Sequence, residues 1–177
     1  AEIVSAGLDL DVVQFSFDLL DPRTKPHLRD QLLQEIRDSC NDAGLRIHST
    51  CTGLGIYSFN LLMDPRSAAR LDAMDLYRNM IETSSLLGAA ATGGHVGSIS
   101  QRDYQMKRTR EERITELITS LQALAEEAAK TGQFLFWETM PIARESPCTI
   151  SELRRMHERI NRNSKVRIDL CIDTGHQ

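Results

Sequence analysis

The sequence predicts an α/β fold in which parallel strands alternate with helices. Five short runs of apolar, β-branched and aromatic residues are separated by longer segments whose apolar residues recur every three or four positions. Such an alternation is typical of a parallel sheet covered by amphipathic helices. The last two runs each lead into an acidic residue, Glu138 and Asp173. Carboxylates therefore stand at the carboxyl ends of two predicted strands.

Composition limits the classes of function. The chain has 177 residues, of which 41% are hydrophobic and 26% charged, which suits one globular domain with a sizeable core. A formal net charge of -4 gives no general attraction to nucleic acid or anionic membranes and favours a small polar substrate. Apolar runs fall short of the roughly 20 residues of a membrane span, so we expect a cytoplasmic protein. The cysteines lack metal-site or disulfide spacing and are predicted to be reduced (Cys40, Cys51, Cys148 and Cys171).

The elements of the first half follow from periodicity and stop signals. Residues 1–7 have the pattern of a helix end that stops at Gly7, and residues 8–17 are a predicted strand. Residues 25–43 are predicted to be a helix, because apolar residues recur at every fourth position (Leu28, Leu32, Ile36 and Cys40). A second strand is predicted over residues 45–50, followed by a glycine-bearing loop. Residues 67–87 then give a long helix with one apolar face (Leu71, Met74, Tyr77, Met80, Ile81 and Leu87).

The segment 58–66 repeats most of the segment 16–23, with one residue inserted. Both contain a phenylalanine, two leucines and an Asp-Pro-Arg triplet, and they lie about 42 residues apart. That spacing suits one strand-plus-helix unit, with chance similarity as the alternative.

The second half continues the same alternation. Residues 89–97 are predicted to be a strand of small residues that opens into a glycine-rich loop carrying His95. A polar loop leads to a helix over residues 111–130, which ends before Gly132, and a strand follows over residues 134–137. Thr149 or Ser151 begins a helix that runs to about Arg162, and the final strand covers residues 166–172.

Alternation by itself fits either an open doubly wound sheet or a closed barrel. No G-x-G-x-x-G motif follows the first strand, which gives no support for dinucleotide binding. The acids favour a barrel, because all strands of a barrel end at one mouth, where carboxylates from neighbouring strands can share a divalent cation. Glu138 and Asp173 are the candidate pair.

Two stretches carry a resemblance to a known family. They are Phe134-Leu-Phe-Trp-Glu138 and Ile168-Asp-Leu-Cys-Ile-Asp-Thr-Gly-His176, the latter with an Asp followed three residues later by His. In this order the chain resembles the xylose isomerase-like superfamily of sugar phosphate isomerases and epimerases, which includes tagatose/psicose 3-epimerases and, more distantly, endonuclease IV. The resemblance implies a TIM barrel in which Glu138 and Asp173 are metal ligands and His176 holds a substrate oxygen. It also implies an incomplete barrel of about strands two to six, a single domain over residues 1–177 truncated at both ends, because eight strands need roughly 250 residues.

The implied activity is a metal-dependent isomerisation or epimerisation of a sugar or sugar phosphate. Removing a proton beside a carbonyl leaves an enediolate, which a divalent metal can stabilise while a carboxylate moves the proton. Glu138 would serve as both ligand and acid/base group. Two carboxylates with histidine favour Mn²⁺, Mg²⁺ or Co²⁺, and zinc remains an alternative. We expect a small carbohydrate substrate, no nucleic acid or membrane partner, and leave open a homo-oligomer at full length.

Three further residues are weaker candidates. His95 is either a substrate-facing residue at the barrel mouth or a packed one, and His48 is either a second mouth histidine or a core residue. Several ketose epimerases of the family have a second glutamate six residues beyond the metal glutamate, where this chain has Arg144. Arg144 is a candidate contact for a phosphate or carboxylate, which favours a phosphorylated ketose of four or five carbons, and the alternative is a surface ion pair with Glu145.

Two other classes of function compete with the isomerase. An endonuclease IV-like phosphodiesterase acting on abasic DNA would add His48 and His95 to the metal cluster. The acidic charge balance and an aromatic content of 5% argue against a DNA-binding face. A non-catalytic barrel is the third hypothesis, and it predicts that no metal binds.

Overall fold

The computed structural model describes residues 1–145 and 147–176. Its centre is one sheet of five strands in the order β1-β2-β3-β4-β5, and every adjacent pair is parallel. The strands are β1 (Val12–Ser16), β2 (Arg46–Cys51), β3 (Ala91–Gly94), β4 (Phe134–Glu138) and β5 (Ile168–Cys171). Parallel neighbours in sequential order, each joined through a helix, are the arrangement of a β/α barrel. The predicted α/β barrel fold, present in part, is confirmed.

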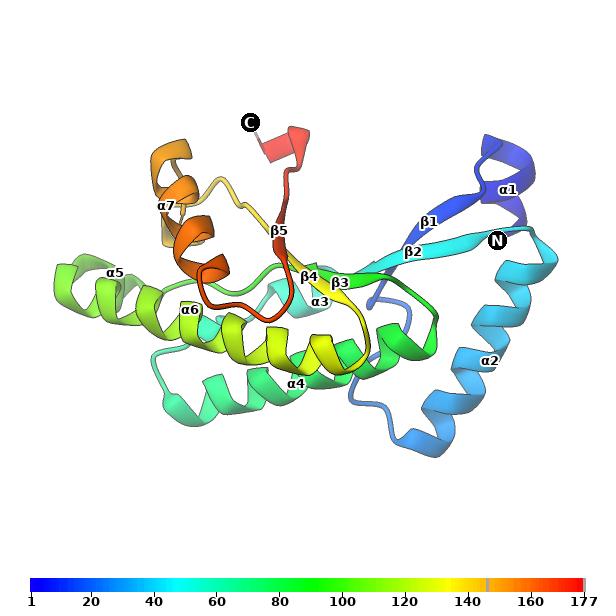
Figure 1. The fold of residues 1–177 in the computed structure, drawn as a ribbon, viewed down its shortest axis with the longest axis horizontal. Coiled ribbons are helices and arrows are strands. Elements are labelled where there is room, and N and C mark those ends of the chain that lie inside the picture. The colour runs from blue at the N-terminus through cyan, green and yellow to red at the C-terminus, as the bar shows by residue number, and fades with distance from the viewer. Residues whose placement is uncertain (146, 177) are drawn as a thin grey trace.

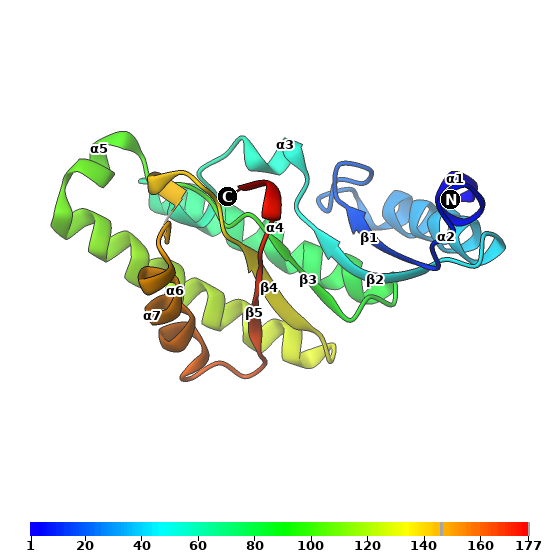
Figure 2. The same cartoon turned by 90° about the horizontal axis from the view of Figure 1, so that it is seen from above.

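Five longer helices flank this sheet: α1 (Glu2–Leu8), α2 (Pro26–Asp42), α4 (Ser67–Leu86), α6 (Lys107–Lys130) and α7 (Ile150–Asn161). The shorter elements are α3 (Leu54–Tyr57), α5 (Gln101–Gln105) and the 3₁₀ turns η1 (Leu61–Met63), η2 (Ala143–Glu145) and η3 (Thr174–His176). Figure 1 shows α4 and α6 side by side beneath β3 and β4, with α7 near β5. Figure 2 shows the sheet curving between α2 at one end and α7 at the other. Within the described part of the chain, no helix is both long and apolar enough to cross a bilayer.

The helices near the N-terminus and around residues 101–110 differ from the predicted ones. α1 runs through Gly7 and ends at Leu8, and its C-cap residue Asp9 takes the left-handed conformation with φ 53°. The predicted polar loop contains α5, whose first turn is capped because the Ser100 side chain accepts the N–H of Asp103. α6 consequently begins at Lys107 rather than at residue 111.

The hydrophobic core lies between the sheet and its helices. Its largest fully buried apolar side chains include Trp137 of β4, Leu117 and Leu124 of α6, and Met80 of α4. Burying each such side chain stabilises the fold by about 1.5–3 kcal/mol relative to leaving it in water. Asn161 also ties α7 to β5, because its side chain both donates to the Ile168 carbonyl and accepts the Ile168 N–H.

The predicted apolar face of α2 is confirmed for Leu32, Ile36 and Cys40, which are partly buried and pack against the core, but not for Leu28. Leu33 is 1% exposed and Arg29 is buried, whereas Leu28 is 45% exposed. A strict four-residue spacing drifts around a helix that has 3.6 residues per turn, so it does not keep to one face. Arg29 is accommodated in the interior because its guanidinium bonds Asp30 and Glu82, the latter on α4. Leu71, predicted to face the core from α4, is likewise exposed.

The repeated segment noticed in the sequence is a repeated local structure. Arg23 donates its backbone N–H to Asp21 at 2.9 Å, and Arg66 donates its backbone N–H to Asp64 at 2.9 Å. In each turn the guanidinium of the arginine also donates two hydrogen bonds to the same carboxylate. The two Asp-Pro-Arg turns lead into α2 and α4, so they direct the chain into equivalent helices of successive strand-plus-helix units.

Candidate active site

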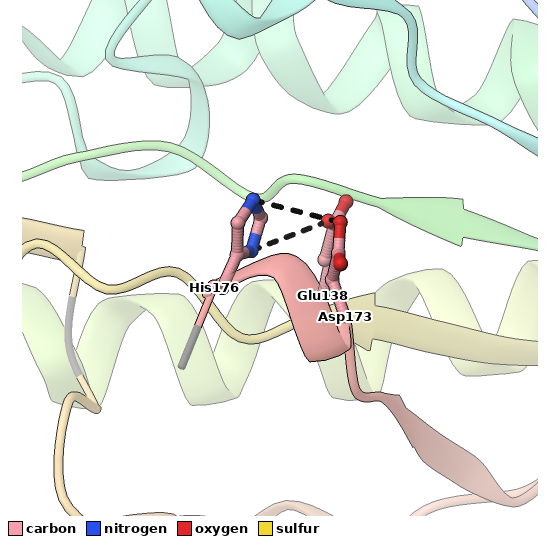
Figure 3. Close-up of side chains that lie close together, drawn as sticks. All are labelled: Glu138, Asp173 and His176. Atoms are coloured by element: carbon pink, nitrogen blue, oxygen red, sulfur yellow. Dashed lines mark ion pairs between the residues drawn. The ribbon is translucent and has the colours of Figure 1, made fainter.

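Glu138 and Asp173 converge at the carboxyl end of the sheet. Glu138 is the last residue of β4 and pairs with Cys171 of β5, so Asp173 follows two residues beyond that pair. His176 of η3 lies against both: its Nδ1 is 3.6 Å from Glu138 Oε1 and its Nε2 is 3.6 Å from Asp173 Oδ2 (Figure 3). One donor atom from each of the three residues lies within 4.8 Å of the others. We call Glu138, Asp173 and His176 the metal corner.

The turn after β5 places His176 in this corner. Asp173 Oδ1 accepts the N–H of Gly175 at 2.7 Å, and the Asp173 carbonyl accepts the N–H of His176 at 3.1 Å. Asp is well suited to such a turn, because its short side chain reaches the backbone two residues ahead. The His176 ring is held from a second strand too, since Nδ1 is 3.2 Å from the carbonyl oxygen of Thr139. The sequence Asp-Thr-Gly-His therefore folds the imidazole back toward β4.

The charges of the metal corner suit a cation. Partial burial raises the pKa of Glu138, the nearby His176 opposes this rise, and repulsion from Asp173 adds to it. Two carboxylates and an imidazole form a donor set that Mn²⁺, Mg²⁺, Co²⁺ or Zn²⁺ accepts in proteins. The donors present therefore fit a divalent ion. The structure also places an imidazole nitrogen of His176 within 4.8 Å of both carboxylates, and the substrate contact that the resemblance implies for His176 stays a prediction.

The metal corner opens on a cavity of about 400 Å³, which we call the site cavity. That volume is within the usual range for small-molecule sites, roughly 300–1,000 Å³. Residues from the carboxyl ends of all five strands contribute to its wall (Ser16, Asp18, Thr52, Gly53, Leu54, Tyr57, His95, Glu138, Met140, Asp173 and His176). Among these described lining residues there is no lysine or arginine. The carboxylates of the cavity lining are Asp18, Glu138 and Asp173.

His95 is rigidly held on the side of the site cavity formed by β3. Its backbone N–H donates to Thr52 Oγ1 at 2.8 Å, and its carbonyl accepts the hydroxyl of Tyr77. The residue before His95 must be glycine. Gly94 has φ +115°, and a Cβ at this position would lie 2.3 Å from Oγ1 of Thr52, which follows β2. The ring is 3% exposed, and neither nitrogen has a hydrogen-bond partner among the described residues. Burial lowers the pKa of His95 to about 4, so the imidazole is neutral at pH 7.

Tyr57 and Glu145 extend the wall around His95. The rings of Tyr57 and His95 meet edge to face with centroids 4.7 Å apart, and the Tyr57 hydroxyl donates to Glu145 Oε1 at 3.1 Å. Glu145 Oε2 is buried and has no partner among the described residues. Burial raises the pKa of Glu145, an effect that the Tyr57 hydroxyl partly offsets. We call Tyr57, His95 and Glu145 the ring wall.

Comparison with known proteins places this geometry in a family. Residues 1–177 match the family model of the xylose isomerase-like TIM barrel. The chain belongs to that family. It is 25% identical over 177 residues to D-erythrulose 1-phosphate 3-epimerase of Brucella abortus (strain 2308), covering 99% of this chain and 57% of the relative. The chain thus spans somewhat more than half the length of this relative.

Solved structures of xylose isomerase-like barrels agree with the fold. A candidate xylose isomerase from Rhodospirillum rubrum superposes with a TM-score of 0.94 at 27% identity, over 98% of this chain and 59% of that one. D-psicose 3-epimerase with D-tagatose, from Clostridium cellulolyticum H10, gives a TM-score of 0.72 at 19% identity, over 97% of this chain and 56% of that one. At that identity the second likeness concerns the fold alone.

Two candidates lie elsewhere in this xylose isomerase-like barrel. Arg144 does not line the site cavity: its Nη1 donates to the carbonyl of Ile99 at 2.8 Å, and its own carbonyl accepts the Ile99 N–H at 2.7 Å. These bonds fasten η2 to the segment after β3, and a substrate contact for Arg144 stays a prediction. His48 is exposed on β2 and outside the cavity lining, so its interpretation as a core residue is wrong.

No motif in the sequence predicts the ring wall as a unit. Glu145 was recognised only as a neighbour of Arg144, and Tyr57 followed a glycine-bearing loop without a motif of its own. Only the three-dimensional structure brings residues from β2, β3 and β4 connections together here. A polar aromatic residue shortly after a glycine loop at a strand end was the one available cue.

Proposed function

We propose that the protein is a divalent-metal-dependent isomerase or epimerase acting on a small ketose or ketose phosphate. The convergence of Glu138, Asp173 and His176 at one corner of a ligand-sized cavity carries the proposal. The name of the Brucella relative, an epimerase of a four-carbon ketose phosphate, supports the substrate class. The family membership supports the fold on which such a site is built.

The residues of the site have complementary roles in the proposed reaction. Glu138, Asp173 and His176 would hold the cation, which when bound supplies positive charge against the negative charge that develops on the substrate oxygens. Glu138, at the end of β4 and facing the site cavity, would take the proton from the carbon beside the carbonyl. Delivery of that proton to the neighbouring carbon completes an isomerisation, whereas an epimerisation needs a second acid/base group that protonates the opposite face. Neutral His95 can donate one hydrogen bond and accept another, which fits a sugar hydroxyl.

The charges of the site cavity bear on whether the substrate is phosphorylated. Its described lining contains Asp18, Glu138 and Asp173 but no lysine or arginine, and Arg144 is bonded to the Ile99 carbonyl instead. These walls suit carbonyl and hydroxyl oxygens better than a phosphate. We therefore propose that this part of the barrel binds the carbonyl and hydroxyl end of the ketose, whether or not the other end carries a phosphate.

The alternative phosphodiesterase has less support. It needs His48 and His95 beside the metal corner, yet His48 is outside the site cavity. A DNA backbone would also meet the acidic side chains of the described lining rather than the basic groups that phosphate contacts require. A non-catalytic barrel is distinguished by metal binding, which it should lack.

The test is the rate of ketose interconversion with excess Mn²⁺ for Glu138→Gln. The substitution keeps the shape of the side chain but removes the charge that holds a cation and the basicity that accepts a proton. We expect the rate to fall by roughly 10²- to 10⁴-fold with an unchanged melting temperature, because loss of general base catalysis alone has that effect. Glu145→Gln should lower the rate far less. Glu127→Gln serves as a control outside the site, because Glu127 forms an ion pair with Lys130 on α6. A rate for Glu138→Gln equal to that of the parent would refute the assignment.

A further inference from the structure

A second and larger cavity lies beside the site cavity, separated from it by α3. This lateral cavity has a volume of about 590 Å³. Gly53, Leu54 and Tyr57 line the site cavity, whereas Gly55 and Ile56 line the lateral cavity. The partition is therefore a single four-residue turn of helix with a different cavity on each side.

Asp18 holds this turn in place from another strand. It follows β1, and its Oδ2 accepts the Leu54 N–H at 3.0 Å while its Oδ1 accepts the Gly55 N–H at 3.0 Å. Ser16 Oγ also donates to the carboxylate, at 3.1 Å. One turn of helix is not stable by itself, and α3 receives no cap from its own N-cap residue, Gly53. Of the described residues, Asp18 alone lines both cavities.

The sequence of the turn is adapted to this carboxylate. A Cβ on Gly53 would lie 2.1 Å from Asp18 Cγ, a distance that real atoms do not reach. Gly53 has φ -93° and ψ -174°, an extended conformation open to any residue, so the need for glycine is steric and arises from Asp18. A Cβ on Gly55 would lie 3.6 Å from Asp18 Oδ1, which is an ordinary contact. The two glycines thus form a matched pair for experiment.

We propose that Asp18 is a positioning residue that fixes α3 as the wall between the two cavities and thereby limits the length of the ketose that the site accepts. The part concerning the ketose rests on the function proposed above, and the part concerning the wall does not. Tyr57 couples the wall to the site, because it is the last residue of α3 and contacts both His95 and Glu145. Releasing α3 would join cavities of about 400 and 590 Å³ and displace Tyr57 from the ring wall.

The wall is tested without reference to activity by amide hydrogen exchange. In Asp18→Ala the Leu54 and Gly55 amides lose their acceptor, and we expect their exchange to be at least ~10-fold faster than in the parent. Asp21→Ala is the matched control: Asp21 also accepts a backbone N–H, from Arg23, but lines only the lateral cavity. It should leave the Leu54 and Gly55 amides unchanged. Unchanged exchange in Asp18→Ala would overturn the proposal.

A double-mutant cycle tests whether the steric need for glycine comes from Asp18. Gly53→Ala should accelerate exchange of the same amides, whereas Gly55→Ala should not. In the Asp18→Ala background the added methyl of Gly53→Ala no longer meets a carboxylate, so its effect should disappear. Equal effects of Gly53→Ala in both backgrounds would show that the glycine serves another contact and would contradict the role given to Asp18.

Kinetics with 2-ketoses of four and six carbons test the consequence for the substrate. For Asp18→Ala we expect the KM of the four-carbon ketose to rise ~10-fold with kcat changed less than ~3-fold, because binding geometry is lost while Glu138 stays in place. The ratio of kcat/KM for the six-carbon to the four-carbon ketose should rise ~10-fold. Faster exchange with an unchanged ratio in an active enzyme would overturn the limit on length. A parent without activity refutes the proposed function, and with it the limit on length, while the exchange result still decides the wall.

Discussion

The two sides of the site cavity differ in how their polar groups are satisfied. In the metal corner, Glu138, Asp173 and His176 are partly exposed and lie against one another, so each has a charged or polar neighbour. In the ring wall, His95 is buried, and neither its two ring nitrogens nor Glu145 Oε2 has a hydrogen-bond partner within residues 1–145 and 147–176. Because buried polar groups are nearly always hydrogen-bonded in native proteins, the nitrogens of His95, a residue of the cavity lining, are suited to hydrogen-bond a bound molecule.

The difference indicates two kinds of ligand for the two sides. Two carboxylates beside each other repel, and a cation relieves that repulsion. The ring wall presents a neutral imidazole and a hydroxyl already committed to Glu145, which suit uncharged hydrogen-bonding groups. The metal corner thus presents two carboxylates to the site cavity, whereas the ring-wall residues that line the cavity, Tyr57 and His95, are uncharged. The four substitutions or titrations below perturb one side and leave the other intact.

The largest expected effect is on metal affinity in Asp173→Asn. The amide keeps the turn, since its oxygen can still accept the Gly175 N–H, but the negative charge is lost. We expect Mn²⁺ affinity to fall on the order of 10³-fold, about 4 kcal/mol, as for removal of one partner of a close charge pair. Asp169→Asn on β5 is the control, because Asp169 pairs with Arg167 instead of the metal corner. Calorimetric titration with Mn²⁺ measures both, and equal affinities for parent and Asp173→Asn would remove Asp173 from the donor set.

The metal corner was within reach of sequence reasoning. Glu138 and Asp173 follow apolar runs that had to be strands, and the parallel order of those strands brings their ends together. The sequence also indicated that His176 belongs to the site, although through a family motif. Its place within the donor set depends on the η3 turn and the Asp173 bonds, which the spacing Asp-x-x-His alone does not specify.

The ring wall was out of reach because it depends on tertiary contacts. Tyr57 and Glu145 are 88 residues apart, and the bond between them depends on the conformations of α3 and η2, which no periodicity describes. The burial of Arg29 on α2 was out of reach for a related reason, because its guanidinium pairs with Glu82 of another helix. Hydropathy periodicity predicts helices and strands, whereas contacts between residues of distant loops or helices depend on how those elements pack around the sheet.

The second effect is a pH dependence of stability that originates in the ring wall. The pKa of His95 is lowered from 6.5 to about 4 by burial, so between these values the unfolded chain binds more protons than the folded one. Stability is therefore fully present above about pH 6.5 and is lost as the pH falls toward about 4, by about 3 kcal/mol. The raised pKa values of Glu138 and Glu145 change stability with pH in the opposite direction. The difference in stability between the parent and His95→Phe at each pH therefore isolates the contribution of the histidine. Urea unfolding at about pH 7 and about pH 4 measures it, and a parallel pH dependence in both proteins would contradict a buried neutral His95.

The third effect is a gain in stability at pH 7 for His95→Phe. The aromatic ring still packs against Tyr57, and the substitution removes two buried nitrogens that have no partner in the part of the chain that the structure describes. We therefore expect the free energy of unfolding to rise by about 1–2 kcal/mol. Ketose binding should weaken, because the donor and acceptor are gone. His157→Phe is the control, because His157 is a partly buried ring beside Trp137 and lies outside the site cavity. This variant should show neither the gain in stability nor the loss of ketose binding. A less stable His95→Phe would show that the imidazole nitrogens have partners in solution.

The smallest effect is expected for Tyr57→Phe, which removes only the hydroxyl that connects α3 to Glu145. The ring contact with His95 stays, so stability should fall by about 1 kcal/mol, the value of one hydrogen bond to a partly buried group. The pKa of Glu145 should rise further, because the lost hydroxyl is the donor that opposes the effect of burial. A carboxyl-carbon NMR titration follows Glu145, and urea unfolding measures the stability. Tyr104→Phe is the control, since its ring lies under Arg110 away from the ring wall and should leave Glu145 unchanged. If Glu145 titrates identically in the parent and in Tyr57→Phe, the hydroxyl does not hold the carboxylate, and the ring wall consists of His95 and the Tyr57 ring alone.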